Sequence, residues 1–301
     1  MKNILFLLIF LSMFADAQVN RFYYDYRFIP DSNHKEDVKK EMMYLDIDEK
    51  GSIYYSRDRF IADSTSMADI RRQIKSGSGS LNVTRNERAG QVSYKVTKEY
   101  PEFKTFLFTR VSMDLYKVKE DQKPEWKILA EKQKIGEYDT QKATTTYGGR
   151  EWIAWFSTAI PFQDGPYKFY GLPGLIVKLE DTTGSHIMTL VGNRKIDSPV
   201  VETESGITGN LKIVGIGGKE LEISKDQYRK VWKAYVNDPS KNMREMMMRN
   251  SGGDNTKMSF KVKTSDGKEI SDPSQMFREM EKKTKESLAK NNNPIEPDLV
   301  K

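Results

Sequence analysis

Residues 152–181 contain the densest concentration of aromatic rings, prolines and glycines in the chain, and they constrain the fold more than any other segment. From Trp152 to Phe156, large apolar side chains occupy both odd and even positions. This pattern predicts a strand that is covered on both faces or lies deep in a bowl. Pro161 ends the strand because proline has no N–H to donate to a neighbouring strand.

Two tight turns are predicted after Pro161. Asp164-Gly165-Pro166 combines a side chain that caps its own backbone, a glycine and a fixed φ. Leu172-Pro173-Gly174 suits a type II turn, in which the third residue needs a positive φ. A strand then resumes at Leu175 and turns at 181–184 into a partner strand that starts at His186. The residues assigned to these corners are Pro161, Asp164, Gly165, Pro166, Gly171, Leu172, Pro173, Gly174, Leu175 and Ile176.

The aromatic residues between the corners allow two interpretations. They fit a core corner, in which rings plug the space between two rigid turns, and this interpretation carries more weight. They also fit the rim of a ligand site, where rings and turn backbone line a mouth. The residues assigned to such a rim are Trp155, Phe162, Tyr167, Phe169 and Tyr170.

The same region carries a family resemblance. Besides the string Gly-Leu-Pro-Gly-Leu-Ile at 171–176, the matching positions are Tyr138, 141–144, 148–150, Trp155, 160–161 and 164–167. With these residues the chain resembles the GLPGLI family of exported Bacteroidetes proteins. The resemblance extends to the aromatic N-terminal strands and to the Asn-Pro-Ile-Glu near the C-terminus. It implies export but no reaction and no catalytic residues. More loosely, the first strands resemble the bowl-shaped β domain that precedes some bacterial peptide N-glycanases.

The N-terminus predicts export. Lys2 precedes an apolar run over 4–14, and Ala15-Asp16-Ala17 is a small-x-small cleavage site. We therefore expect a signal peptide over 1–17, one β-rich GLPGLI-type domain over 18–290 and a polar, flexible tail over 291–301. The chain has no cysteine, so we expect neither a lipoprotein nor disulfides. The expected location is the periplasm, with release to the medium as the alternative.

The formal net charge of +6 is spread in blocks of mixed sign. Without a basic helix or an aromatic nucleic-acid platform, it favours a solubility charge over a nucleic-acid partner. No apolar run after the signal is long enough to span a membrane. The partners considered are an apolar or glycan ligand or another envelope protein.

The predicted fold class is α+β and β-dominated: a strongly curved antiparallel sheet, forming a bowl or half-barrel, with C-terminal helices packed on one side. Helices are expected from Asp63, Ser64 or Ser66 to about Lys75, after a Ser224 cap, around Met243, and from Asp272 to about Lys290. The strands expected before the central stretch are 22–28, 40–48, 52–56, 91–100, 104–118 (bent near Ser112), 126–131 and 138–147. Further edge strands are expected at 200–202 and 209–214, and a short one at 257–264.

No catalytic constellation is evident. His34 and His186 are the only histidines, their spacing is not that of zinc ligands, and there is no Gly-x-Ser-x-Gly. We expect no metal and no cofactor. Two functional hypotheses remain: a non-catalytic binding or accessory protein of the cell envelope, and, as the alternative, a hydrolase of envelope glycans or peptides that uses carboxylates near Glu151 and Asp164.

Overall fold

One large sheet dominates the computed structural model, which describes residues 18–76, 90–112, 114–197, 220–250, 262–263, 269–270 and 272–300. Its twelve strands lie in the order β12-β6-β5-β4-β3-β2-β1-β11-β10-β9-β8-β7, and β12 and β7 are its two edges. All neighbouring strands are antiparallel except β12 and β6, which are parallel. The β-dominated fold class is therefore confirmed, with one parallel pair in a sheet that was expected to be antiparallel throughout.

The strands before the central stretch are β1 (Val19–Phe28), β2 (Lys39–Ile47), β3 (Gly51–Ser56), β4 (Lys95–Glu99), β5 (Lys104–Val111), β6 (Asp114–Glu120), β7 (Lys127–Ile135) and β8 (Tyr138–Tyr147). Those that follow are β9 (Arg150–Ser157), β10 (Leu175–Asp181), β11 (His186–Ile196) and β12 (Glu220–Ser224). A separate pair consists of β13 (Val262–Lys263) and β14 (Glu269–Ile270). The helices are α1 (Arg57–Ser76), α2 (Lys225–Asn237), α3 (Lys241–Asn250), α4 (Pro273–Lys290) and a 3₁₀ turn at Pro297–Leu299.

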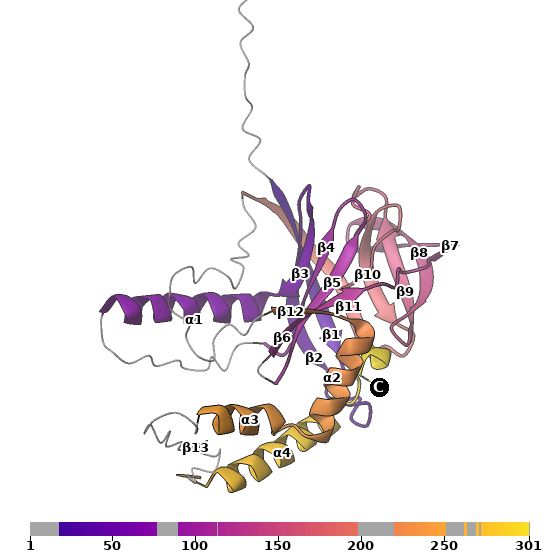
Figure 1. Cartoon of the computed structure of the whole chain (residues 1–301). Helices are drawn as coiled ribbons and strands as arrows, with labels where there is room; N and C mark the ends of the chain where they lie inside the picture. The colour runs from indigo at the N-terminus through magenta and orange to yellow at the C-terminus, as the bar shows by residue number, and fades with distance from the viewer. Residues whose placement is uncertain are drawn as a thin grey trace, which may run out of the picture.

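Strand β1 joins the two halves of the sheet, because it pairs with β2 on one side and with β11 on the other. Its side chains alternate as the sequence predicts: Phe22, Tyr24 and Tyr26 are buried in the main core, and the intervening residues face the other way. We call the face that carries these three rings the inner face. Figure 1 shows β7, β8 and β9 at one end of the sheet, with α1, α3 and α4 at the opposite side of the picture.

Several element boundaries differ from the expectation: β4 is shorter than 91–100, β7 is longer than 126–131, and β12 was not expected as a strand. Two further differences change the local structure. Residues 104–118 do not form one bent strand; β5 and β6 are a hairpin that turns at Ser112, which adopts a φ of 56°. Helix α1 begins at Arg57, directly after β3, and not near Asp63. The hydroxyl of Ser56 accepts the backbone N–H of Arg59, so the helix is capped about two turns before Asp63, the first residue that the sequence indicated.

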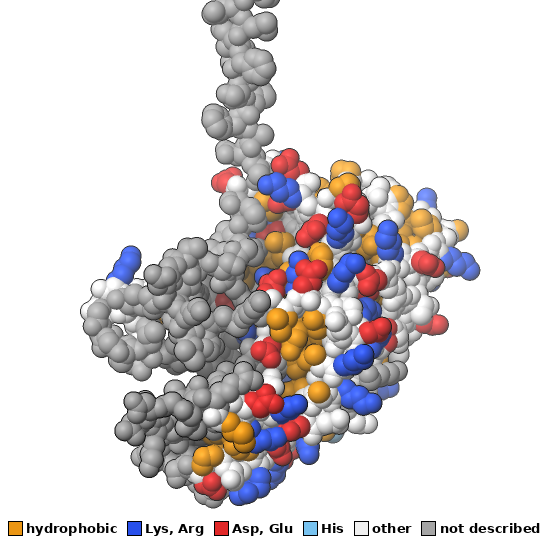
Figure 2. All heavy atoms as spheres, viewed as in Figure 1, with side chains coloured by type: hydrophobic (Ala, Val, Ile, Leu, Met, Phe, Trp, Pro, Cys, Tyr) orange, Lys and Arg blue, Asp and Glu red, His pale blue; other side chains and the backbone are white. Residues whose placement is uncertain are grey.

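The C-terminal helices start where their capping residues predict. Ser224 and Gln227 form a reciprocal capping box on α2, and Asp272 caps α4 just before Pro273. Helix α2 packs its buried Tyr228 against Tyr116 of β6, with 6.3 Å between the ring centroids. In Figure 2, acidic and basic side chains are interspersed over the face that is shown. None of the described helices is both long and apolar enough to cross a bilayer.

Residues 291–299, which we call the C-terminal strap, are packed against the sheet, although the sequence predicts a polar, flexible tail here. Glu296 and Leu299 are only 2% and 5% exposed. The strap lies against the β8–β9 turn, where Gly148 has a φ of 64° and an added Cβ would come within 2.6 Å of Glu296. This close approach explains the need for glycine that the sequence indicates at Gly148. A Pro-broken polar composition therefore does not make this segment a solvent-exposed tail.

The second predicted corner is a site of close backbone approach. Gly174 has a φ of 149°, and a Cβ at this position would lie 2.2 Å from the carbonyl oxygen of Ser157. The predicted signal peptide and the edge strands at 200–202 and 209–214 lie outside the described residues, as do residues 257–261 and the side chains of Met67 and Ile74.

Candidate functional site

The segment between β9 and β10, residues 158–174, is the central loop, and buried Lys98 of β4 holds it in place. The Lys98 ammonium donates to the carbonyl oxygens of Gly165, Tyr167 and Phe169 at 2.7, 3.1 and 3.3 Å. It also lies 2.5 Å from the Asp164 carboxylate, and neither side chain is exposed. Burial lowers the pKa of Lys98 more than the Asp164 carboxylate raises it.

A second buried charge cluster joins the central loop to β6, to α2 and to the C-terminal strap. The Lys168 ammonium lies 2.8 Å from Glu120 of β6 and 2.6 Å from Glu296 of the strap. The Tyr167 hydroxyl donates to Glu296 at 2.7 Å, and Lys225 of α2 lies 3.2 Å from Glu120. Burial opposes the charge on Lys168, but the two carboxylates outweigh it and raise its pKa.

A third cluster surrounds Asp181 at the end of β10. Arg150 donates to its carboxylate at 3.0 Å, and the backbone N–H of His186 donates to it at 2.7 Å. The His186 ring accepts from the Tyr26 hydroxyl at Nδ1 and donates from Nε2 to the Asn293 carbonyl. Burial, followed by the Arg150 charge, lowers the pKa of His186 to about 4. This ring is therefore a neutral core group and not a free base.

The structure separates the five residues that were assigned to a ligand rim. Tyr167 and Phe169 are buried in the main core, and Tyr170 is 9% exposed. Phe162 is partly buried and packs edge-on against Phe22 on the inner face. Trp155 alternates with the core residues of β9 and lies on the opposite face, where the Lys142 ammonium is 5.9 Å from its ring. The geometry therefore corresponds to the core-corner interpretation of this stretch.

The carboxylates of the hydrolase hypothesis are not brought together around an open site. Asp164 is fully buried and paired with Lys98, while Glu151 is exposed on β9. His34 lies in a surface loop beside Asp31, whereas His186 is buried in the core. In the part of the chain that the structure describes, no group of three His, Asp or Glu side chains is placed to hold a metal ion.

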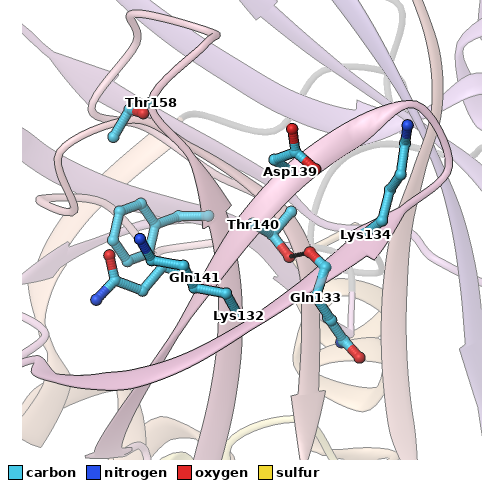
Figure 3. Close-up of a pocket in the computed structure, with 8 residues that line it drawn as sticks. Lys132, Gln133, Lys134, Asp139, Thr140, Gln141 and Thr158 are labelled. Carbon is cyan, nitrogen blue, oxygen red and sulfur yellow. Dashed lines mark hydrogen bonds between the residues drawn. The ribbon is translucent and has the colours of Figure 1, made fainter.

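An open pocket remains on the inner face, at the β7–β9 end of the sheet. We call it the inner-face pocket; its volume is about 360 Å³, toward the small end of the range for small-molecule sites. Figure 3 shows the β7–β8 hairpin with Thr158 across from it. The lining residues are Lys132, Gln133, Lys134, Asp139, Thr140, Gln141, Phe156 and Thr158.

Strand register explains why four polar side chains of the hairpin share this face. Phe156 faces the core, and Gln141 of β8 is directly opposite it, so Gln141 also points to the inner face. Lys132 is opposite Gln141, and Lys134 is opposite Asp139, which puts all four polar side chains on one face. The hairpin itself is fastened by Thr140, whose hydroxyl donates to the Gln133 carbonyl at 2.7 Å, and by Gln141, which donates to the Leu129 carbonyl at 2.6 Å.

Three charged groups of this pocket differ from those under the central loop. Lys132, Lys134 and Asp139 are exposed and make no ion pair within the described residues, whereas Lys98 and Lys168 are fully engaged. A charged group that is already paired has little left to offer a ligand. This end of the inner face therefore presents polar side chains that a ligand could reach.

A second hollow, of about 450 Å³, lies beside the loop between β6 and β7. It is lined by Asp121, Gln122, Lys123, Glu125 and Thr146. The Asp121 carboxylate lies 3.2 Å from the Lys119 ammonium on the surface. Its walls are a polar loop without an apolar floor, so we give it no further role.

The sequence did not single out the pocket residues. Alternation along 127–135 and 138–147 predicts that Lys132 shares a face with Lys134 and that Asp139 shares a face with Gln141. It does not say whether that face is the inner or the outer one. The register with β9 was needed to decide that they face inward.

The neutral state of His186 predicts an acid-side loss of stability. Its pKa in the folded chain is about 4, against an ordinary value of 6.5, so between these values the unfolded chain binds the proton and the folded chain does not. Stability should therefore fall as the pH drops from about 6.5 to about 4, by about 3 kcal/mol from this group. Urea unfolding across this range, on the protein and on His186→Asn, measures the loss as the difference between the two curves.

His34→Gln is the matched control for that experiment. Its exposed ring has a pKa raised by the hydrogen bond to Asp31, so any contribution is present at low pH and is lost as the pH rises. The two histidine variants should thus change the pH dependence in opposite directions. If the free energy of unfolding of His186→Asn falls between pH 6.5 and 4 as it does in the unsubstituted protein, the assignment of a neutral ring is contradicted.

Comparison with known proteins gives a match to a family model and several distant structural matches, two of which are described here. A family model described as a protein of unknown function (Porph_ging) matches residues 148–178, the part of the chain that includes the 171–176 string. No curated protein matches the chain. Among solved structures, "Structure of PNGF-II in C2 space group" matches with a TM-score of 0.46 and 15% identity over 72% of this chain. "Structure of PNGF-II in P21 space group" matches with a TM-score of 0.43 and 14% identity over 71%. The chain spans about a third of that protein, 33% in each case.

Proposed function

We propose that this chain is an exported, GLPGLI-type protein of the cell envelope that binds a glycan in the inner-face pocket without transforming it. The observation that carries the proposal is the pairing of charges: buried carboxylates under the central loop are engaged, and exposed polar groups without ion pairs gather in one pocket. Of the two ligand classes considered, the polar lining favours a glycan over an apolar molecule. The periplasm is the proposed location.

Curvature of the sheet is part of this proposal. Lys225 lies 3.2 Å from Glu120 of β6 and 5.7 Å from the ring of Tyr147 in β8, although these strands are close to opposite edges of the sheet. Both ends therefore approach the same side chains, with the central loop between them. A bowl that is filled at its centre and open at the β7–β9 end accounts for these contacts, with the C-terminal helices on one side.

A pocket-filling variant tests the binding role. Thr158 is exposed at the pocket, so Thr158→Trp should occupy it, while Thr182→Trp puts the same side chain in the exposed β10–β11 turn. We expect neutral and acidic trisaccharides, titrated by calorimetry, to include at least one that binds the protein and Thr182→Trp but not Thr158→Trp. Mass spectrometry of the recovered sugar should show it intact.

Two results would overturn the proposal. Cleaved sugar would replace the binding role with the hydrolase alternative. Absence of binding by the whole panel, or binding that Thr158→Trp leaves intact, would remove the pocket as the site.

A further inference from the structure

The two lysines of the inner-face pocket form a pair that is built into one strand. Lys132 and Lys134 are two positions apart on β7, so their side chains leave the same face, and Figure 3 shows Lys132 running toward Gln141 and Lys134 toward the other end of the hairpin. The two ammonium groups can therefore meet separate anionic groups on one ligand. Residues Gln141 and Asp139 lie opposite them on β8. Figure 3 shows Lys134 and Asp139 extending to the same side of the hairpin, and the side chain of Gln133 extending to the other side.

The charge of the pocket is positive. Two ammonium groups and one carboxylate line it, and the other lining side chains are uncharged, so the sum is +1. The nearest acidic residue on β7, Glu131, is engaged by Lys142 at 3.7 Å and alternates to the opposite face. Neither pocket lysine is neutralised in the described structure, and both stay available to an anionic group on a ligand.

We propose that the glycan of this pocket is acidic and that Lys132 and Lys134 each bind one of its carboxylate groups. The inference rests on the proposed glycan-binding function and adds the chemical class of the sugar. Ammonium-to-carboxylate hydrogen bonds are stronger than neutral ones and give a pocket a preference for charged sugars over neutral isosteres. Gln141 and Thr158 supply the amide and hydroxyl groups that sugar hydroxyls need.

A matched ligand pair separates the charge from the sugar. Trigalacturonic acid and its fully methyl-esterified form share one skeleton and differ in the carboxylates. We expect calorimetry to show the acid binding at least about tenfold more tightly than the ester. Raising the salt concentration from about 50 mM to about 500 mM should weaken binding of the acid and leave binding of the ester unchanged.

Protein variants then place the charge. Lys132→Gln and Lys134→Gln should each weaken binding of the acid by about tenfold without changing binding of the ester. Lys127→Gln is the control, because Lys127 lies on the same strand opposite the outward-facing Thr144 and should change binding by less than about twofold. Asp139→Asn should strengthen binding of the acid, because it removes a negative charge next to Lys134 that repels the ligand carboxylate. A purely structural role of the lysines does not predict this gain.

The outcomes distinguish the two proposals. If acid and ester bind equally, if Thr158→Trp abolishes this binding and if the lysine variants leave it intact, the proposal of an acidic glycan is overturned. The glycan site itself is then kept. Loss of the acid preference in Lys127→Gln alone would also overturn the proposal of an acidic glycan. Failure of every sugar to bind, or insensitivity to Thr158→Trp, would overturn the glycan site itself.

Discussion

Lys98→Met should lower the free energy of unfolding by about 3–5 kcal/mol, the cost of leaving one partner of a buried ion pair uncompensated. The substitution removes the 2.5 Å partner of Asp164 and the donor to three carbonyl oxygens of the central loop. Since the loop carries both corners of the central stretch, its attachment to β4 should weaken as well. Urea unfolding monitored by tryptophan fluorescence measures the effect.

Lys104→Met is the control for that substitution, because Lys104 is exposed at the start of β5 and should change stability by less than about 0.5 kcal/mol. A double variant that adds Asp164→Asn should be less destabilised than the sum of the two single variants, as expected for groups in direct contact. Additive effects, or a loss below about 1 kcal/mol in Lys98→Met, would show that the pair does not hold the loop.

Glu296→Ala should cost about 3 kcal/mol, although the residue lies in a segment whose composition is that of a surface tail. The Glu296 carboxylate accepts the Tyr167 hydroxyl and pairs with Lys168, and all three groups are buried. Without it, the Lys168 ammonium keeps only Glu120 as an acidic partner among the described residues. Thermal and urea unfolding give the change directly.

Glu286→Ala, on the exposed surface of α4, provides the comparison, with an expected effect below about 0.5 kcal/mol. Limited proteolysis adds an independent readout: cleavage after residue 290 should be faster in Glu296→Ala than in the control. Equal stability and equal cleavage in the two variants would mean that the strap is not anchored as described.

Local signals in the sequence predicted much of the fold. The alternation of Phe22, Tyr24 and Tyr26 was enough to place the inner face of β1, and the serine at 224 was enough to place the start of α2. In the same way, the glycine at 174 indicated a residue with positive φ at the second corner. Each of these features depends on residues within a few positions of one another.

What the sequence did not reveal depends on distant partners. A lysine reads as a surface residue unless its counter-charge is known, and Lys98 and Lys168 pair with carboxylates 66, 48 and 128 positions away. The turn at Ser112 carries no glycine, proline or asparagine at the residue with positive φ, so the sequence indicated a bend there and not the full turn of a hairpin. The inner-face pocket was missed because the register of the hairpin with the next strand decides which of its side chains point to the inner face.

The position of β1 at the middle of the sheet has a consequence for how the protein matures. Its second neighbour, β11, ends at Ile196, so a growing chain exposes the aromatic strand Val19–Phe28 with one side unpaired until the second half has been made. Such an edge can recruit strands from other molecules. The order of the strands along the chain therefore makes premature collapse of the first half a route to association between molecules, and pairing with β11 ends that exposure.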